Sequence, residues 1–409
     1  MVTTPTSSRL GRLEFTTLLA ATMAATALGI DLMLPAFADI REAYGLAADS
    51  TAVAGIVTAY FVGLAVSQAL WGPVADRFGR KPTLYAGLVV YGFAALASAL
   101  APSLAFLYVS RFLWGVGSGG SRVVALSVVR DRYEGEAMAK AMSFIMAIFV
   151  LVPVVAPTLG AGILAISSWR WVFGFCVIYA IAVGLWSRRL AETLKPEYRM
   201  ELQFRRVARA ARFVVANRQT LGYTLALTVL FGVFSSYLAS SEIIFGEVYG
   251  RAELFPFIFG GVAGLMGLAM LTNGFIVTRI GLRRLVHGAL IGFVLMAGTI
   301  FSVAAAWDGV PPLGVFLALL GIQMVLYALL FPNMNTIAMD PMGSVAGMAA
   351  AVIGMVSIAG GALLGSLLDR AFDGTVQPFA FGWVASGLAA SAFVLWAERG
   401  RLFKPLREA

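Results

Sequence analysis

The sequence predicts an all-α integral membrane protein with twelve transmembrane helices in two pseudo-symmetric six-helix halves. Of its 409 residues, 60% are hydrophobic and only 12% are charged, about half the charged fraction of a typical soluble domain. Several long stretches lack any charged residue, and each can provide the roughly 20 apolar residues that a membrane-spanning helix needs. A short basic turn also occurs twice along the chain, once in each half.

The apolar runs are continuous and do not alternate with polar residues, so they predict helices rather than the strands of a membrane barrel. One long polar stretch, at about 189–219, separates the sixth run from the seventh. The expected spans cover residues 15–40, 50–74, 83–101, 104–129, 139–166, 170–188, 220–245, 254–277, 285–306, 312–335, 345–368 and 377–397.

The polar stretch sets the expected domain limits. Residues 1–190 are expected to form one six-helix bundle, 191–219 a cytoplasmic linker and 220–409 a second bundle. Within the linker, apolar residues at helical spacing predict a short amphipathic helix at the membrane surface, and a solvated linker is the alternative. These apolar residues are Leu202, Val207, Ala211 and Val214.

The net charge of +9 is distributed unevenly. Most of the 30 Lys and Arg fall in loops on one side of the expected spans, whereas the loops of the other side hold Arg41, Arg170, Arg251 and Arg370. This pattern follows the positive-inside rule and predicts a multi-pass protein of the cell inner (plasma) membrane with both termini in the cytoplasm. The excess charge therefore indicates contact with an anionic lipid bilayer rather than with nucleic acid.

The basic turn lies between the second and third spans of each half. Four positions of the first copy recur at one constant offset: Gly72, Arg77, Gly79 and Lys81 correspond to Gly274, Arg279, Gly281 and Arg283. Duplicated halves are typical of secondary transporters, in which the substrate binds between the two repeats. The repeat therefore predicts transport of a small molecule.

Five short motifs occur in the order expected of a known family. The first of them, the basic turn, resembles the loop signature of the major facilitator superfamily, and the other four resemble its drug:proton antiporters of the Bcr/CflA type. The motifs are Gly72–Pro82, Gly29–Pro35, Arg111–Gly117, Val129–Tyr133 and Ser168–Trp171. In the fifth span, Ala156 and Ala161 stand where this branch usually has glycine.

The resemblance implies a proton-coupled secondary active transporter that exports small amphipathic or hydrophobic compounds, such as antibiotics, by alternating access. We expect a monomer whose partners are protons and a small-molecule substrate, without a cofactor. Proton-coupled import of a small metabolite is the alternative among transporters, and a membrane-embedded enzyme or sensor is the alternative from another class. The sequence has no phosphate-binding loop for ATP. The lone His287 is expected in a cytoplasmic loop, so no metal site is expected.

Asp31 and Arg111 are the expected proton-coupling residues. Asp31 lies within the first span, where a carboxyl group is costly unless it faces a wet cavity. A low-dielectric environment favours the protonated form of such a group, as proton coupling requires. The alternative is a solvated charge at the helix end, since Pro35 can break the helix. Arg111 lies in the fourth span, where an arginine stays charged, and it matches the arginine that the resemblance implicates in proton coupling.

The basic turn and the motif after the fourth span are the expected gating residues. A glycine permits the tight reversal, and the carboxylate of Asp76 can interact with a neighbouring helix N-terminus. By resemblance, Asp76 faces the start of the eleventh helix near Gly343, and Asp131 is expected to pair with Arg77 or Arg80. The expected gating set is Gly72, Asp76, Arg77, Gly79, Arg80, Lys81, Arg130 and Asp131.

Aromatic, amide and charged side chains within the spans are the expected lining of a substrate pocket, because ligand sites combine apolar walls with a few polar groups. Glu242 is included in this set, although its place near the end of the seventh span favours a solvated position at the periplasmic mouth. The set is Tyr60, Arg122, Phe234, Tyr237, Glu242, Gln323 and Tyr327.

Overall fold

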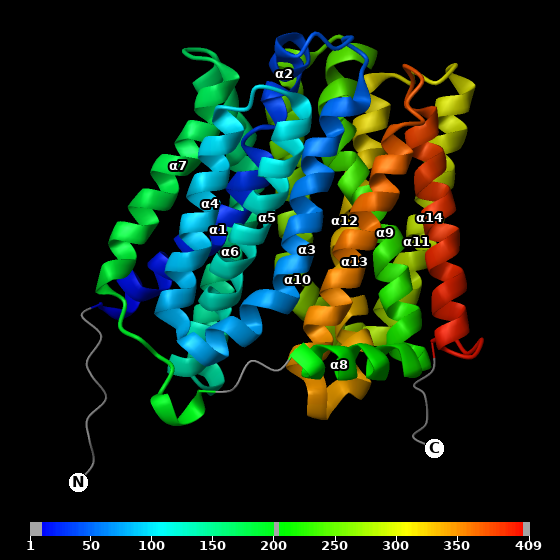
Figure 1. Ribbon diagram of the computed structural model, residues 1–409. Coiled ribbons are helices and arrows are strands. Elements are labelled where there is room, and N and C mark those ends of the chain that lie inside the picture. The colour runs from blue at the N-terminus through cyan, green and yellow to red at the C-terminus, as the bar shows by residue number, and fades with distance from the viewer. Residues whose placement is uncertain (1–9, 200–203, 404–409) are drawn as a thin grey trace. The chain divides into compact units, whose positions relative to one another are not determined.

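The computed structural model describes residues 10–199 and 204–403 and consists, over this range, of helices joined by turns (Figure 1). Twelve of its helical segments are long and apolar enough to cross a membrane. The all-α fold with twelve spanning helices, predicted from the sequence, is therefore confirmed.

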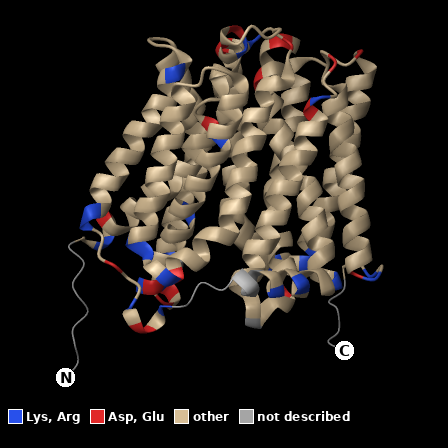
Figure 2. Cartoon of the chain, in the orientation of Figure 1, with Lys and Arg blue, Asp and Glu red and all other residues tan. Residues whose placement is uncertain are grey.

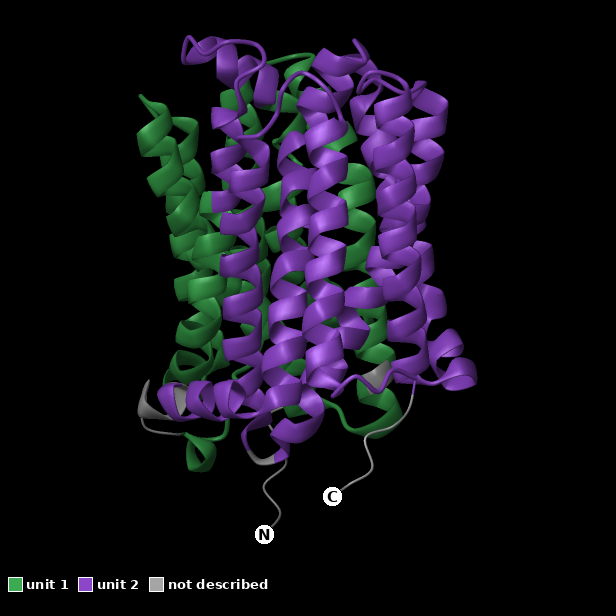
Figure 3. Ribbon diagram, turned by 90° about the vertical axis from the view of Figure 1, so that its right-hand side faces the viewer, with its two compact units in different colours: residues 1–36, 59–204 green, residues 37–58, 205–409 purple. Residues whose placement is uncertain are grey.

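The described chain packs into two compact units, coloured green and purple in Figure 3. The first unit contains the chain up to Ala36 together with Ala59–Phe204, and the second contains Phe37–Thr58 together with the chain from Arg205 onward. The segment Phe37–Thr58 thus belongs to the first half of the sequence but packs within the second unit. The domain limits at residues 190 and 220 stay a prediction.

The long helices of the first half begin and end close to the expected spans, except that the first, expected to reach residue 40, ends at Asp31. Their bounds are α1 Arg12–Asp31, α3 Gly55–Phe78, α4 Arg80–Ala99, α5 Leu104–Arg132, α6 Gly135–Leu164 and α7 Trp169–Trp186. The second unit contains the short helix α2 Phe37–Ala43 and the long helices α9 Arg218–Ile243, α10 Phe255–Ile280, α11 Leu282–Ala306, α12 Leu313–Met339, α13 Ala346–Asp369 and α14 Gln377–Ala397.

The polar stretch before α9 contains a short helix, α8 Phe204–Ala216, which runs across the direction of the spanning helices of the second unit (Figure 1). Ala210 and Val214 are buried on one side of α8, whereas Arg209 and Arg212 are exposed. The chain therefore forms the amphipathic helix rather than a linker without structure. Leu202 and the side chain of Val207 lie outside the described residues.

The basic turn has the same backbone conformation in both copies. Gly79 precedes α4 with φ +105°, and Gly281 precedes α11 with φ +88°. Positive φ values of this kind are unfavourable for residues with a Cβ, so glycine is needed at both positions. The duplication read from the sequence is thus also a duplication of local structure.

The first span is interrupted close to Asp31. Helix α1 ends at this residue, and a 3-10 turn at Leu34–Ala36 leads into α2. Helix α6 passes so near the interruption that a Cβ at Gly160 would meet the backbone carbonyl oxygen of Leu32. Gly160 therefore allows the close approach of α6 to the interrupted part of the first span.

Charged side chains lie mostly near the helix ends of each unit, and few lie along the middle of the helices (Figure 2). This distribution is expected for helices that cross a hydrocarbon layer, where an unpaired charge is costly. The exceptions therefore mark candidate functional residues.

We predict that Gly160→Ala destabilises the protein, whereas Gly162→Ala does not. The added methyl group at Gly160 must push α6 away from Leu32, and such overpacking costs about 1–3 kcal/mol. Gly162 lies on the same helix, and a Cβ there would meet no atom within 4 Å. Thermal unfolding of the two purified variants checks this, and equal melting temperatures would contradict the packing described.

Candidate functional site

Arg111 is held in an aromatic and carbonyl cage inside the first unit. Its side chain lies on α5 and is fully buried. Nη2 donates a hydrogen bond of 2.7 Å to the backbone carbonyl of Gly29 on α1. The guanidinium carbon lies 4.6 Å from the ring centre of Tyr60 and 4.6 Å from that of Trp114. These cation–π contacts and the hydrogen bond fix a permanent positive charge against α1.

Asp31 lies two residues after the carbonyl that Arg111 contacts. The carboxyl group is at the end of α1 and only 4% of the residue is exposed. The position is therefore buried, although Pro35 follows within the 3-10 turn, and the alternative of a solvated helix-end charge is wrong. The salt bridges found among the described residues do not include Asp31, so the structure brings Asp31 and Arg111 to the same part of α1 without pairing them directly.

Tyr60, expected in the substrate pocket, is part of the Arg111 cage. Its hydroxyl lies 2.9 Å from the carbonyl oxygen of Thr26 and 2.5 Å from the hydroxyl of Ser118. The residue is fully buried and its ring covers Gly29, where a Cβ would come within 2.8 Å of the tyrosine oxygen. Tyr60 therefore positions α1 next to Arg111.

Arg80 is the centre of the expected gating set in the first unit. Nη1 lies 2.6 Å from Asp76, and Nε lies 3.0 Å from Asp131. Asp131 thus contacts one of its two expected partners. The contact expected between Asp76 and the chain near Gly343 would join residues of two units and stays a prediction.

Glu192 completes this cluster and was missed in the sequence. Its two carboxylate oxygens accept hydrogen bonds of 2.9 and 3.0 Å from the backbone N–H groups of Arg80 and Lys81. The N–H groups of the first turn of a helix have no partner within the helix, so Glu192 caps the N-terminus of α4. A carboxylate shortly after the sixth span was the available signal.

The remaining gating residues surround this cluster less tightly. The Lys81 ammonium donates a hydrogen bond of 2.9 Å to the carbonyl of Arg188. The Arg77 guanidinium lies over the ring of Phe78, and Arg77 and Arg130 are exposed. Gly72 lies inside α3, one turn before Asp76.

The second copy of the basic turn is also bound by a carboxylate from later in the sequence. Arg283 forms two hydrogen bonds with Glu398, which is fully buried immediately after α14. Tyr223 donates to the same carboxylate at 2.7 Å, and His287 lies 3.3 Å from the Tyr223 hydroxyl. His287 is buried within α11, so the expectation that it lies in a loop is wrong.

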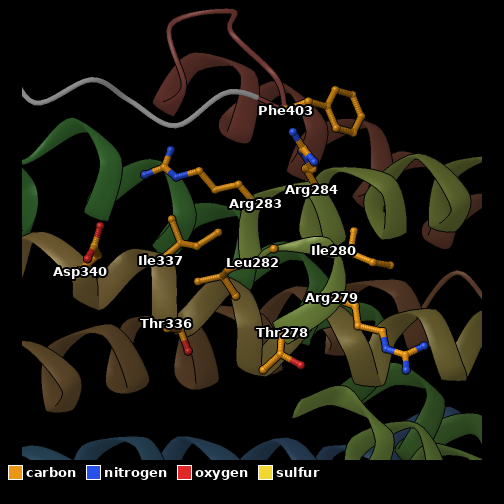
Figure 4. A pocket seen from close by; sticks show the side chains of 11 residues that line it. Thr278, Arg279, Ile280, Leu282, Arg283, Arg284, Thr336, Ile337, Asp340 and Phe403 are labelled. Atoms are coloured by element: carbon orange, nitrogen blue, oxygen red, sulfur yellow. The ribbon is translucent and has the colours of Figure 1, made fainter. Parts of the chain in front are cut away.

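A pocket of about 590 Å³ lies beside this second turn (Figure 4). It is bounded by the turn at 278–284, by Thr336, Ile337 and Asp340 and by Phe403. Three arginines line it, and the guanidinium of one of them, Arg283, is already neutralised by Glu398.

Three expected pocket residues of the second unit form one aromatic cluster. Phe234 stacks on Tyr327 with ring centres 4.7 Å apart, and Phe234 also contacts Tyr237. Gln323 lies one turn before Tyr327 on α12 and is fully buried, and neither amide atom has a hydrogen-bond partner among the described residues. The cluster thus combines flat apolar walls with an unused amide. Arg122, also expected in this pocket, belongs to the first unit and is half-buried on α5.

Glu242 differs from its expected solvated position. It is 6% exposed, and its two carboxylate oxygens accept hydrogen bonds of 2.9 and 2.8 Å from Nη2 of Arg41 on α2. The buried carboxylate of Glu242 is tolerated because the guanidinium of Arg41, in the same unit, neutralises its charge. Arg41 was missed because it was assigned to an external loop.

We predict that Asp131→Asn lowers stability, whereas Glu136→Gln does not. The first change removes a charged partner from Arg80, whose side chain is 10% exposed, and should cost about 1–3 kcal/mol. Glu136 pairs with Lys140 on the exposed surface of α6, where such pairs contribute about 0–1 kcal/mol. Denaturation of the two variants under identical conditions distinguishes them, and equal losses would contradict a structural role of the Arg80 cluster.

The sequence of the chain is similar to those of known proteins. An uncharacterized MFS-type transporter, YdgK of Bacillus subtilis, is 27% identical over 351 residues, which cover 84% of each chain. A bicyclomycin resistance protein homolog of Haemophilus influenzae is 29% identical over 223 residues, 54% of this chain and 56% of the relative, so this match spans about half the relative's length.

The fold is that of solved transporters. The crystal structure of a D-xylose–proton symporter superposes with a TM-score of 0.74 and 17% identity, covering 95% of this chain and 99% of the symporter. The family model of the Major Facilitator Superfamily matches residues 19–366. The chain therefore belongs to the Major Facilitator Superfamily and is a multi-pass membrane transporter of small molecules, not an enzyme.

Proposed function

We propose that this transporter exports small amphipathic or hydrophobic compounds across the cell inner membrane in exchange for protons. The observation that carries the proposal is the burial of Asp31 two residues after Gly29, whose backbone carbonyl accepts a hydrogen bond from Arg111. An ionised carboxylate buried without a partner is costly, so we propose that Asp31 carries a proton in the state described.

Arg111 supplies the complementary charge. When Asp31 releases its proton, the carboxylate and the permanent guanidinium charge attract one another across a short stretch of α1. Attraction between these groups changes the contacts of α1 with α5. We propose that proton binding and release at Asp31 thereby shift the balance between the two access states, as a ligand does when it binds one state better.

The aromatic cluster of the second unit supports an amphipathic substrate. Stacked rings at Phe234 and Tyr327 offer flat apolar contact area, and the Gln323 amide offers one donor and one acceptor. The name of the relative from Haemophilus influenzae, a resistance protein homolog, agrees with export of an antibiotic. Tyr60, Arg122 and Glu242 were also expected to line the substrate pocket. We propose that they do not contact the substrate at this cluster and instead influence transport through the helices next to them.

The Arg80 cluster is proposed to act as a cytoplasmic gate. Arg80 and Glu192 hold the turn rigid, while the carboxylate of Asp76 remains 44% exposed. An exposed carboxylate at a fixed position can bind a helix N-terminus in one access state and leave it in the other.

We predict that Asp31→Asn abolishes proton-coupled flux but leaves substrate binding and folding intact. Asparagine keeps the shape of the side chain but cannot bind or release a proton. Asp39→Asn is the matched control, because Asp39 lies in the same candidate span but is exposed on α2. Substrate-induced proton flux in inverted membrane vesicles, tested with antibiotics, dyes and metabolites, is the measurement. Normal coupled flux in Asp31→Asn would remove this residue from the mechanism. In the wild-type protein, proton flux in the direction opposite to that expected for exchange would favour import.

We also predict a cytoplasmic location for α8 and for both termini, and a periplasmic location for the α9–α10 connection. The uneven distribution of Lys and Arg requires this orientation. Single cysteines at Arg209 and Arg251, both exposed, should react with an impermeant thiol reagent from opposite sides of the membrane. The native Cys176 is buried and serves as the unlabelled background. Labelling of Arg209→Cys from the periplasm would reverse the proposed topology.

A further inference from the structure

Asp369 is a second buried carboxyl group, and the function proposed above does not use it. It is the last residue of α13 and is 4% exposed. Oδ1 accepts hydrogen bonds of 2.6 Å from Ser236 and 2.8 Å from Ser240. Oδ2 is buried and has no hydrogen-bond partner among the described residues. One oxygen of the carboxyl group thus accepts two hydrogen bonds from hydroxyl groups, and the other makes no hydrogen bond with the described residues.

The two serines reach Asp369 because α9 and α13 are in close contact. A Cβ at Gly365 would lie 2.6 Å from the carbonyl oxygen of Gly232, so the backbones approach as small residues allow. Ser236 and Ser240 are four residues apart and therefore lie on one face of α9. This face is directed at the end of α13.

Neighbouring charges do not neutralise Asp369. On α9, Glu242 is paired with Arg41 of α2, and Tyr237 is buried. Beyond α13, Arg370 and Asp373 are exposed. The 3-10 turn at Thr51–Ala54 and helix α14, which also pack in this unit, carry no charged side chain. The salt bridges among the described residues do not include Asp369.

We infer that Asp369, together with Ser236 and Ser240, is a second proton-binding site of the transport cycle, an inference that rests on the proton coupling proposed above. The proton binds Oδ2 and forms an O–H bond, while Oδ1 keeps its two hydroxyl donors in both forms. Protonation removes a buried charge that has no counter-ion, and release returns the proton to water on the accessible side. The first unit then holds one proton-carrying carboxyl group, Asp31, and the second unit holds another.

Infrared difference spectroscopy of the purified, reconstituted transporter tests occupancy without any transport step. The protonated carboxylic acid of Asp369 should contribute a carbonyl band that is absent in Asp369→Asn and present in Asp373→Asn, the exposed control. In Ser236→Ala with Ser240→Ala, the band should remain and move to higher frequency, because its carbonyl oxygen has lost two hydrogen bonds. An unchanged spectrum in Asp369→Asn would overturn the site. A melting temperature raised by Na⁺ at constant pH in wild type, but not in Asp369→Asn, would identify a cation site and also overturn it.

Proton flux in the same variants tests the role in transport. Asp369→Asn should reduce the number of protons exchanged per substrate while Asp373→Asn leaves it unchanged. A lost infrared band with unchanged stoichiometry would show that Asp369 is protonated but outside the cycle, and this part of the inference would be wrong. If wild type shows the band but no substrate-dependent proton flux at all, the proposed coupling fails rather than the proton site.

Discussion

The low dielectric of the hydrocarbon core is the constraint on which this structure depends. A polar group inside the helix bundle loses its hydration and must be paired or neutralised. Arg111 obtains a carbonyl and two aromatic faces, and Arg41 obtains Glu242. Asp31 and Asp369 lack a counter-charge among the described residues, and for a carboxyl group the remaining solution is a proton. The same physics that orders the bundle thus selects its candidate proton carriers.

Close helix packing is the second consequence of this environment, because lipid provides no hydrophobic drive between helices. Gly160 lets α6 touch the interrupted first span, and Gly365 lets α13 touch α9. The first contact lies at Leu32, next to Asp31, and the second lies near Asp369, which accepts hydrogen bonds from Ser236 and Ser240 of α9.

The sequence predicted the twelve spans, because hydrophobic length is a local property that packing does not override. It also predicted the repeated turn, whose glycines have positive φ in both copies. Arg111 and Asp31 stood out because charges are rare within apolar runs. The partners of the charged residues were less accessible to prediction. Glu192, Glu398 and Arg41 are distant in sequence from the groups they bind, and only tertiary packing brings each pair together.

The salt bridge between Arg41 and Glu242 makes the second unit depend on a segment encoded in the first half of the gene. A C-terminal half synthesised alone would bury the carboxylate of Glu242 without its guanidinium, and breaking a buried ion pair in this way costs about 3–5 kcal/mol. Residues 37–58 are thus a segment of the first half that completes the second unit, comparable to a strand exchanged between subunits. Joining the two halves in one polypeptide thus supplies the second unit with the partner of a buried charge.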